Sequence, residues 1–325
     1  MSLQKVIGII KKYDKFLITS HINLEGDAIC SQLALLELIK KMKKNALCVD
    51  NDKVSSNFDF LPGIRHIKQY EGEDIDYTIA MVLDCPTLDR AGSVRGLLSK
   101  AKKIVNIDHH ISNDKFGDVN WVSSGSSSVG EMIYTLYKEL KIKMSKEAAL
   151  CIYISILTDT GSFNYSNTSG LTHRIASEIL ELGIKPEEVS NRVYENKSIE
   201  EIKLLGSAIN SLETVENDRI AVMVYTKDML KKTGCGYPNT ENFINIARSI
   251  KNVDIAIFIK EHTDKENEFN ISLRSKGNIN VNKLASFFGG GGHKNAAGCI
   301  IRGTLAEVRS KIILKAKEVL KKQRH

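Results

Sequence analysis

The first half of the chain alternates short apolar runs with longer stretches in which apolar residues recur at helical spacing. The apolar runs predict strands at 15–20, 46–51, 76–85, 102–110 and, at an edge of the sheet, 117–122. The helical spacing predicts helices at 27–44, 127–140, 145–160 and 169–183. Strands that alternate with helices in this way are typical of a parallel α/β sheet.

From about Val193 the pattern changes. A polar-faced helix at 195–213 has no tight strand partner, so we expect it to connect two domains. Beyond it, the strands at 254–262 and 268–276 flank a charged turn and should form a hairpin, which predicts a mixed sheet. The other elements expected here are a strand at 219–226, a helix pair through 239–250, a strand at 298–303 and a final amphipathic helix.

The predicted fold is therefore α/β, with an N-terminal parallel-sheet domain layered by helices (1–193), a connector helix (194–213) and a smaller C-terminal mixed-sheet domain (214–325). We expect the active-site cleft between the two domains, with an opening that could gate turnover.

Composition narrows the class of protein. The six cysteines are scattered without a C-x-x-C pair, which argues against a disulfide framework and favours a reducing cytoplasm. No apolar run approaches the roughly 20 residues of a membrane helix, and lysines interrupt the N-terminal apolar run, unlike a cleaved signal. We expect a cytoplasmic protein with no membrane partner. The net charge of +7 gives weak support for a polyanionic substrate.

Carboxylates and histidines follow the expected strands at one edge of the first sheet. Each alone has a structural explanation, such as a helix cap at Asp27 or a turn at Asp84. Together they fall beyond the carboxyl ends of parallel strands, where ligands bind in such sheets. The residues are His21, Glu25 and Asp27 after the first strand, Asp84, then Asp108, His109 and His110, and finally Asp159 after an apolar segment.

Several carboxylates with a minority of imidazoles and no thiolate suit Mn²⁺ or Mg²⁺. Two such ions would require a bridging carboxylate, and Asp84 on a central strand is the natural bridge. A centre of that kind serves the hydrolysis of phosphate esters.

The motifs "VLDCP", "NIDHH" and "LTDTGSF", after an H-x₃-[DE]-x-D turn, resemble those of the DHH phosphoesterases. The segment 272–298, with its G-G-G-G-H, resembles the DHH-associated domain. Order and spacing are similar to the nanoRNase (oligoribonuclease) and pAp-phosphatase subgroup over essentially the whole chain.

This resemblance implies roles for the acidic and histidine residues. One Mn²⁺ would be held by His21, Glu25 and Asp84, and a second by Asp27, Asp84, His109 and Asp159, with Mg²⁺ as an alternative metal. Asp108 would orient His109. His110 would lie near the scissile phosphate or the leaving group and supply a proton or positive charge.

The glycine run before His293 has three interpretations: a flexible loop, a dinucleotide fingerprint or a phosphate cradle made by backbone N–H groups. The fingerprint fails, since Lys294 stands where its last glycine should be. The resemblance favours the cradle, with the predicted substrate contacts Arg274, Ser275, Gly289, Gly290, Gly291, Gly292 and His293. Phe287 and Phe288 are expected at the buried end of a helix.

The resemblance implies a phosphoric ester hydrolase that acts on very short RNA, linear dinucleotides such as pApA or pGpG, or pAp. Long nucleic acid is not expected, because the chain shows no regular aromatic–basic stripe. The sequence leaves a homodimer open.

Two alternatives stay open, and a third is disfavoured. The first motif departs from the family pattern, which has proline, aspartate and glycine where this chain has Leu24, Glu25 and Cys30. This departure allows a nucleotide sensor with an altered first metal position. A pyrophosphatase or polyphosphatase would use the same metal motifs. An aspartic protease is disfavoured, because such enzymes pair two D-T-G loops and this chain has one.

Overall fold

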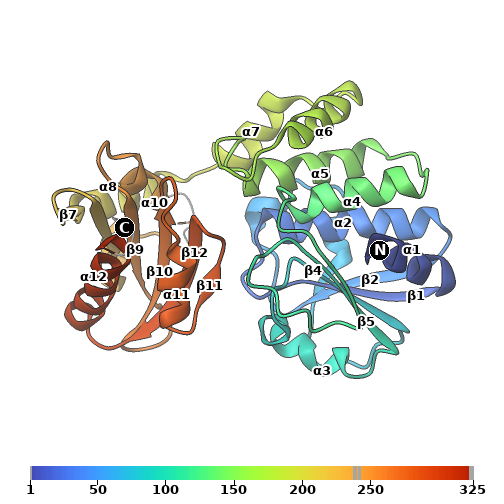
Figure 1. The fold of residues 1–325 in the computed structure, drawn as a ribbon, viewed down its shortest axis with the longest axis horizontal. Helices are drawn as coiled ribbons and strands as arrows, with labels where there is room; N and C mark the ends of the chain where they lie inside the picture. Colours follow the sequence, from blue (N-terminus) through green and yellow to red (C-terminus); the bar gives the residue numbers. More distant parts are fainter. Residues whose placement is uncertain (1, 237–239, 241–242, 322–325) are drawn as a thin grey trace. The chain divides into compact units, whose positions relative to one another are not determined.

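The computed structural model describes residues 2–236, 240 and 243–321. The chain divides into two compact units, Met1–Asn196 (unit 1) and Lys197–His325 (unit 2), which we describe separately (Figure 1). The helix expected to connect the domains is α8 (Ile199–Asn210), and it buries Leu204 and Ala208 in a core of unit 2.

Unit 1 is built on a six-stranded sheet in the order β3-β2-β1-β4-β5-β6, in which every pair of neighbours is parallel. The strands are β1 (Lys15–Thr19), β2 (Asn45–Asp50), β3 (Ile67–Gln69), β4 (Ile79–Leu83), β5 (Lys103–Asp108) and β6 (Val119–Val122). All five residues of β4 are buried apolar side chains, as expected for a strand covered on both faces. This sheet confirms the predicted fold class, and β6 is the predicted edge strand.

Helices cover both faces of this sheet. The main core lies under α1 (Ser2–Lys12), α2 (Gly26–Lys41), α4 (Val129–Glu139) and α5 (Lys146–Asp159). Short turns η3 (Leu88–Val94) and α3 (Arg95–Leu98) cover the other face, while η1 (Ser56–Phe58) and η2 (Ile64–His66) join β2 to β3. Because α5 packs against α2, α4 and α6 (Gly170–Glu181), most of its residues are apolar and buried. The unit ends with α7 (Pro186–Tyr194).

Unit 2 has a mixed six-stranded sheet in the order β11-β12-β10-β9-β8-β7. Its strands are β7 (Glu213–Val215), β8 (Ile220–Tyr225), β9 (Ile255–Glu261), β10 (Glu268–Ser275), β11 (Gly291–Gly292) and β12 (Ala296–Arg302). The pair β8–β9 is parallel and the other pairs are antiparallel, so the predicted β9–β10 hairpin and mixed sheet are confirmed.

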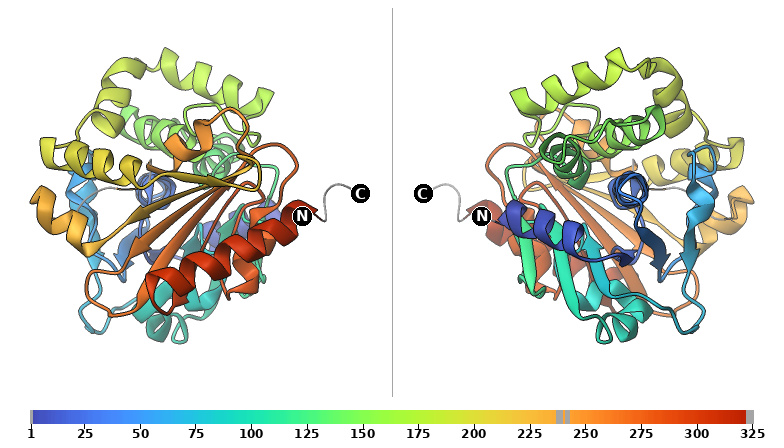
Figure 2. Two further views of the ribbon diagram at one scale, coloured as in Figure 1. Left: turned by 90° about the vertical axis from the view of Figure 1, so that its left-hand side faces the viewer. Right: turned by 90° about the vertical axis from the view of Figure 1, so that its right-hand side faces the viewer.

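Helices also lie on both faces of this second sheet. One face is covered by α8, α9 (Lys227–Thr233) and α10 (Phe243–Ser249), and the other by α11 (Val281–Phe287) and α12 (Leu305–Lys321), which is seen end to end in Figure 2. Of the helix pair predicted through 239–250, residues 239, 241 and 242 lie outside the described residues. Within the described ranges, no helix has the length and apolar character needed to cross a membrane.

One side-chain prediction in unit 2 is wrong. Phe287 ends α11 as expected, but it is 63% exposed rather than buried, and the Lys315 ammonium lies over its ring at 3.7 Å. The following Phe288 is partly buried against the core.

Candidate metal centre

The acidic and histidine residues of unit 1 gather beyond the carboxyl ends of β1, β4 and β5. Strand order reverses between β1 and β4, because the chain proceeds from β1 toward β3 on one side and from β4 toward β6 on the other. Such a switch point is the usual ligand site of an open parallel sheet. Asp27 in the first turn of α2 and Asp159, the last residue of α5, join this edge because α2 packs along α5.

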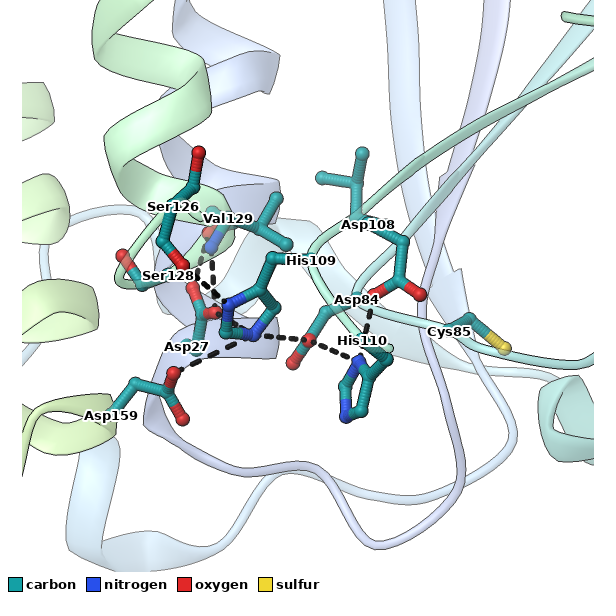
Figure 3. Close-up of polar contacts among 12 residues, drawn as sticks. Asp27, Asp84, Cys85, Asp108, His109, His110, Ser126, Ser128, Val129 and Asp159 are labelled. Atoms are coloured by element: carbon teal, nitrogen blue, oxygen red, sulfur yellow. Dashed lines mark hydrogen bonds and ion pairs between the residues drawn. The ribbon is translucent and has the colours of Figure 1, made fainter. Parts of the chain in front are cut away.

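His109 faces three carboxylates at once (Figure 3). Its Nε2 lies 3.5 Å from Asp84 Oδ1, 3.5 Å from Asp159 Oδ2 and 3.7 Å from Asp27 Oδ2. On the opposite side of the ring, Nδ1 lies 3.2 Å from the carbonyl oxygen of Ser126. A carbonyl at Nδ1 fixes the proton there and leaves Nε2 as the nitrogen that can bind a metal.

His21 repeats this arrangement on the other side of Asp84. Its Nδ1 lies 2.6 Å from the carbonyl oxygen of Ile22, and its Nε2 lies 3.4 Å from Asp84 Oδ2. The two oxygens of Asp84 therefore face the Nε2 atoms of two different imidazoles, Oδ1 that of His109 and Oδ2 that of His21. Asp84 also has a positive φ of 52°, a sparsely populated conformation for a residue with a Cβ, and such strain clusters at functional sites.

Asp27 is anchored by groups from three helices. Oδ2 accepts a hydrogen bond from the Val129 N–H (2.8 Å), and Oδ1 accepts from the Gly130 N–H (3.2 Å). The hydroxyls of Ser31 and Ser155 donate to Oδ1 at 2.8 and 2.6 Å. The carboxylate thus caps the N-terminus of α4 rather than its own helix, and these bonds hold it toward His109.

Asp108 has a different role from the predicted one. Its Oδ1 accepts from His110 Nδ1 at 2.7 Å, and its Oδ2 accepts from the Asn113 amide at 2.6 Å. The prediction that Asp108 orients His109 is wrong, because the Ser126 carbonyl occupies that position. Asp108 instead fixes the ring of His110, whose Nδ1 also lies 3.5 Å from Asp84 Oδ1.

Charge in this cluster is concentrated and buried. Burial, together with the neighbouring Asp84 charge, raises the pKa of Asp27 and raises that of Asp159 well above its usual value. Burial alone would lower the pKa of His21, but contact with Asp84 raises it to about 9. Burial also lowers the pKa of His109. The charges of Asp159 and Asp84 outweigh this effect and raise that pKa well above its usual value. The carboxylates therefore favour a positive charge between them, which a proton or a metal cation can supply.

A divalent cation fits this donor set. Among the described residues, none donates a hydrogen bond to the buried Oδ1 of Asp84, although a buried carboxylate oxygen normally has a donor. Asp27, His109 and Asp159 form one group whose candidate ligand atoms lie within 4.8 Å of one another, and Asp84, Asp108 and His110 form a second. Carboxylate oxygens with imidazole nitrogens are ligands that Mn²⁺ and Mg²⁺ accept.

Glu25 stands apart from these groups. It is the exposed N-cap residue of α2, and its side chain makes no capping hydrogen bond to any described residue of that helix. Among the described residues, no group of mutually close candidate ligands includes it. Its charge nevertheless raises the pKa values of both His21 and Asp159, after larger causes.

In unit 2 the glycine run forms a tight structural turn. The N–H groups of Gly289 and Gly290 donate to Ser286 and Ala285 at the end of α11, and the His293 N–H donates to Ala296. Gly291 and Gly292 form β11 against β12. A Cβ on Gly290 would lie 2.1 Å from the Gly298 carbonyl oxygen, so close strand packing requires a glycine here. Two of the glycine amides predicted to cradle a phosphate, and the amide of His293, are therefore already bonded within the unit.

Two other predicted substrate contacts differ in their surroundings. Ser275 is buried, and its hydroxyl donates to the Ile279 carbonyl oxygen at 2.7 Å and accepts from the Asn295 amide at 2.9 Å. Because the hydroxyl is buried and already bonded, we do not expect it to contact substrate. Arg274 on β10 is half-buried. Its Nη1 donates to the Leu273 carbonyl oxygen, and its buried Nε–H has no acceptor within the part of the chain that the structure describes.

Sequence reasoning missed the groups that hold the ligands in place. Ser31 and Ser155 were detectable, because each lies four residues from an acidic candidate on the same helix face. The Ser126 carbonyl and Asn113 gave no such signal, since loops bring them to the histidines. Arg90, whose Nη2 lies 3.5 Å from His21 Nδ1, was also missed.

Fold and site together define a doubly wound α/β protein with a carboxylate–histidine centre suited to divalent cations. The chain belongs to the DHH family: residues 15–156 match the DHH family N-terminal domain, and residues 217–322 match the DHHA1 domain. This match confirms the resemblance drawn from the motifs.

Two similar relatives share one name. A Bacillus subtilis protein named bifunctional oligoribonuclease and PAP phosphatase NrnA is 30% identical over 91% of this chain and 92% of its own length. A Mycoplasma genitalium protein of the same name is 30% identical over 92% of each chain. Such names are those of hydrolases, which confirms the predicted enzyme class. The crystal structure of an exopolyphosphatase-related protein from Bacteroides fragilis matches with a TM-score of 0.87 at 28% identity, over 99% of this chain and 96% of that chain.

Proposed function

We propose that the chain hydrolyses phosphoester bonds in very short oligoribonucleotides and linear dinucleotides to give mononucleotides, and removes the 3′-phosphate of pAp. The convergence of two imidazole Nε2 atoms on the two oxygens of Asp84 carries this proposal. The names of two relatives that align over nine-tenths of the chain support nucleotides as the substrate class.

For the metal we propose two Mn²⁺ ions, with Asp84 shared between them. His21 and Glu25 would complete the first position, and Asp27, His109 and Asp159 would complete the second. When bound, the ions would supply an acidified water as nucleophile and neutralise charge on the phosphate. The Asp84 oxygen that lacks a hydrogen bond supports the shared role.

The chain's own groups complete the chemistry. Asp108 holds Nδ1 of His110, which orients the other ring nitrogen for proton transfer to the leaving oxygen. Arg274 and His293 stay proposed substrate contacts supplied by unit 2. Asp27, held by four hydrogen bonds, needs no reorganisation as the reaction proceeds.

The test is a substrate panel with purified protein and Mn²⁺: pAp, pApA, pGpG, a five-residue RNA, cyclic di-AMP and pyrophosphate. We expect release of mononucleotide from pApA or pGpG and of phosphate from pAp. Asp84→Asn should abolish both while the fold remains, because Asn tolerates the positive φ at this position. Undiminished hydrolysis by Asp84→Asn, or no hydrolysis of any nucleotide by the parent, would contradict the proposal.

A second candidate is hydrolysis of pyrophosphate or polyphosphate. The name of the Bacteroides fragilis structure, which aligns over the whole of this chain, favours it. The same panel separates the two, since a pyrophosphatase would release phosphate from pyrophosphate faster than from pAp.

A further inference from the structure

Arg90 brings a positive charge to the His21 side of the centre. The residue is half-buried in η3, and its Nη2 lies 3.5 Å from His21 Nδ1. That contact is not a hydrogen bond in the tautomer set by Ile22, because Nδ1 then carries the proton it donates to the carbonyl oxygen at 2.6 Å. Among the described residues, no carboxylate forms an ion pair with Arg90.

The backbone, not the side chain, fixes this position. The Arg90 carbonyl oxygen accepts a hydrogen bond from the Ile22 N–H at 2.7 Å, which ties η3 to the loop that carries His21. Asn51 at the end of β2 accepts from the Ser93 N–H at 2.8 Å. Gly92 lets the turn approach Asn51, since a Cβ there would lie 2.5 Å from the Asn51 amide oxygen. Removal of the guanidinium should therefore leave the loop in place.

Arg95 provides the contrast. It lies five residues along the chain, is exposed, and forms an ion pair with Asp89. An exposed pair of this kind contributes little, and its charge is already neutralised. Arg90, by contrast, is a partly desolvated cation beside a cluster of carboxylates and without a counter-ion among them, and the planar fork of a guanidinium matches the oxygens of a phosphate.

We propose that Arg90 binds a non-bridging oxygen of the scissile phosphate on the His21 side of the centre. This inference rests on the proposed function, because it assigns a substrate contact to the same site. The guanidinium adds positive charge where the phosphate gains negative charge in the transition state, and preorganised donors of this kind contribute strongly to such catalysis.

One competing role acts through His21. The charge of Arg90 opposes the protonation of that imidazole, so the residue could instead keep His21 available as a metal ligand. The two roles predict different losses. If Arg90 contacts the phosphate, its removal lowers kcat/KM at saturating Mn²⁺ and the affinity for phosphate. If it acts through His21, its removal raises the Mn²⁺ concentration needed for activity.

The experiment compares Arg90→Gln and Arg90→Lys with the matched surface control Arg95→Gln. We measure kcat and KM for pApA and pAp at saturating Mn²⁺, the Mn²⁺ activation midpoint, and binding of inorganic phosphate by calorimetry with Mn²⁺ present. Arg90→Gln should lower kcat/KM by about 100-fold, Arg90→Lys should lose less, and both should bind phosphate more weakly. Arg95→Gln should match the parent, and the Mn²⁺ midpoint should stay unchanged throughout.

Full kcat/KM and phosphate affinity in Arg90→Gln would overturn the proposal, as would losses that extra Mn²⁺ restores. If Arg90→Gln does not fold, Arg90→Lys carries the test, because it keeps the charge and removes only the fork. Failure of the proposed function looks different: the parent would hydrolyse no nucleotide, while phosphate binding in the parent and its loss in Arg90→Gln would still support the contact.

Discussion

The two histidines of the D-H-H motif differ in what holds them. The Nδ1 atom of His109 contacts a backbone carbonyl oxygen, and its Nε2 faces three carboxylates. The Nδ1 atom of His110 instead contacts the buried carboxylate of Asp108. Either partner can orient a metal-binding ring, but only the carboxylate also stabilises the protonated ring that proton transfer requires.

This difference makes His110→Ala a test of proton transfer. Activity on pApA should fall by about 100-fold or more, because its alkoxide leaving group needs a proton. A nitrophenyl ester of a nucleotide should lose far less, since nitrophenolate leaves without one. Steady-state rates on both substrates at saturating Mn²⁺ measure the effect, and an equal loss on both would show that His110 acts in another way.

Glu25 gives a second prediction at this scale. It adds a methylene to the aspartate of the family pattern, a shift of about 1.5 Å for its oxygens, and it lies outside the close ligand groups. Glu25→Asp should therefore lower the Mn²⁺ concentration for half-maximal activity. Glu147→Asp, exposed in the first turn of the helix that ends at Asp159, is the control. Superimposable Mn²⁺ titrations of parent and Glu25→Asp would refute a weakened first position.

At the scale of elements, the site depends on how closely α4 approaches α5. Gly130 in the first turn of α4 faces Ser155 of α5, and a Cβ there would lie 2.1 Å from the Ser155 hydroxyl oxygen. That hydroxyl and the Gly130 N–H both bind Asp27. One glycine therefore lets two helices hold one carboxylate.

Gly130→Ala should separate the two helices and disturb Asp27. Overpacking of this kind costs about 1–3 kcal/mol, and the Mn²⁺ midpoint for activity should rise. Gly8→Ala in α1 is the control, because a Cβ there meets nothing within 4 Å and the change should stabilise the helix by about 1 kcal/mol. Urea unfolding and Mn²⁺ titration measure both effects; a Gly130→Ala protein as stable as the parent would contradict this account.

The sequence was sufficient to predict the features that follow from hydrophobic periodicity and from position at the end of a strand. Asp84 and His109 were identifiable because apolar runs end just before them. The partner of Asp108 was not, since two adjacent histidines leave a strand in different directions and only the surrounding loops decide which meets a carboxylate. Gly290 was ambiguous for a related reason: a glycine that admits an anion and one that admits a neighbouring strand look alike until the strand is in place.

At the scale of the whole molecule, the hydrophobic cores are divided between the two units, whereas the proposed metal ligands belong to one unit. Each unit has hydrophobic cores of its own. The proposed metal ligands from His21 to Asp159 all lie in unit 1. The single tryptophan, Trp121 on β6, also lies there and is 9% exposed within that core. Its fluorescence therefore reports the unfolding of unit 1, while circular dichroism reports both units.

Mn²⁺ should stabilise unit 1 selectively. A ligand that binds only the folded state at 100 times its Kd adds about 2.7 kcal/mol, which for a unit of this size corresponds to a rise in Tm of roughly 5–10 °C. The tryptophan transition should move by this amount when Mn²⁺ replaces EDTA, and a second component seen by circular dichroism should stay in place. In Asp84→Asn the tryptophan transition should no longer respond. An equal shift of both components would contradict selective stabilisation of unit 1, because a ligand stabilises only the cooperative unit whose folded state binds it.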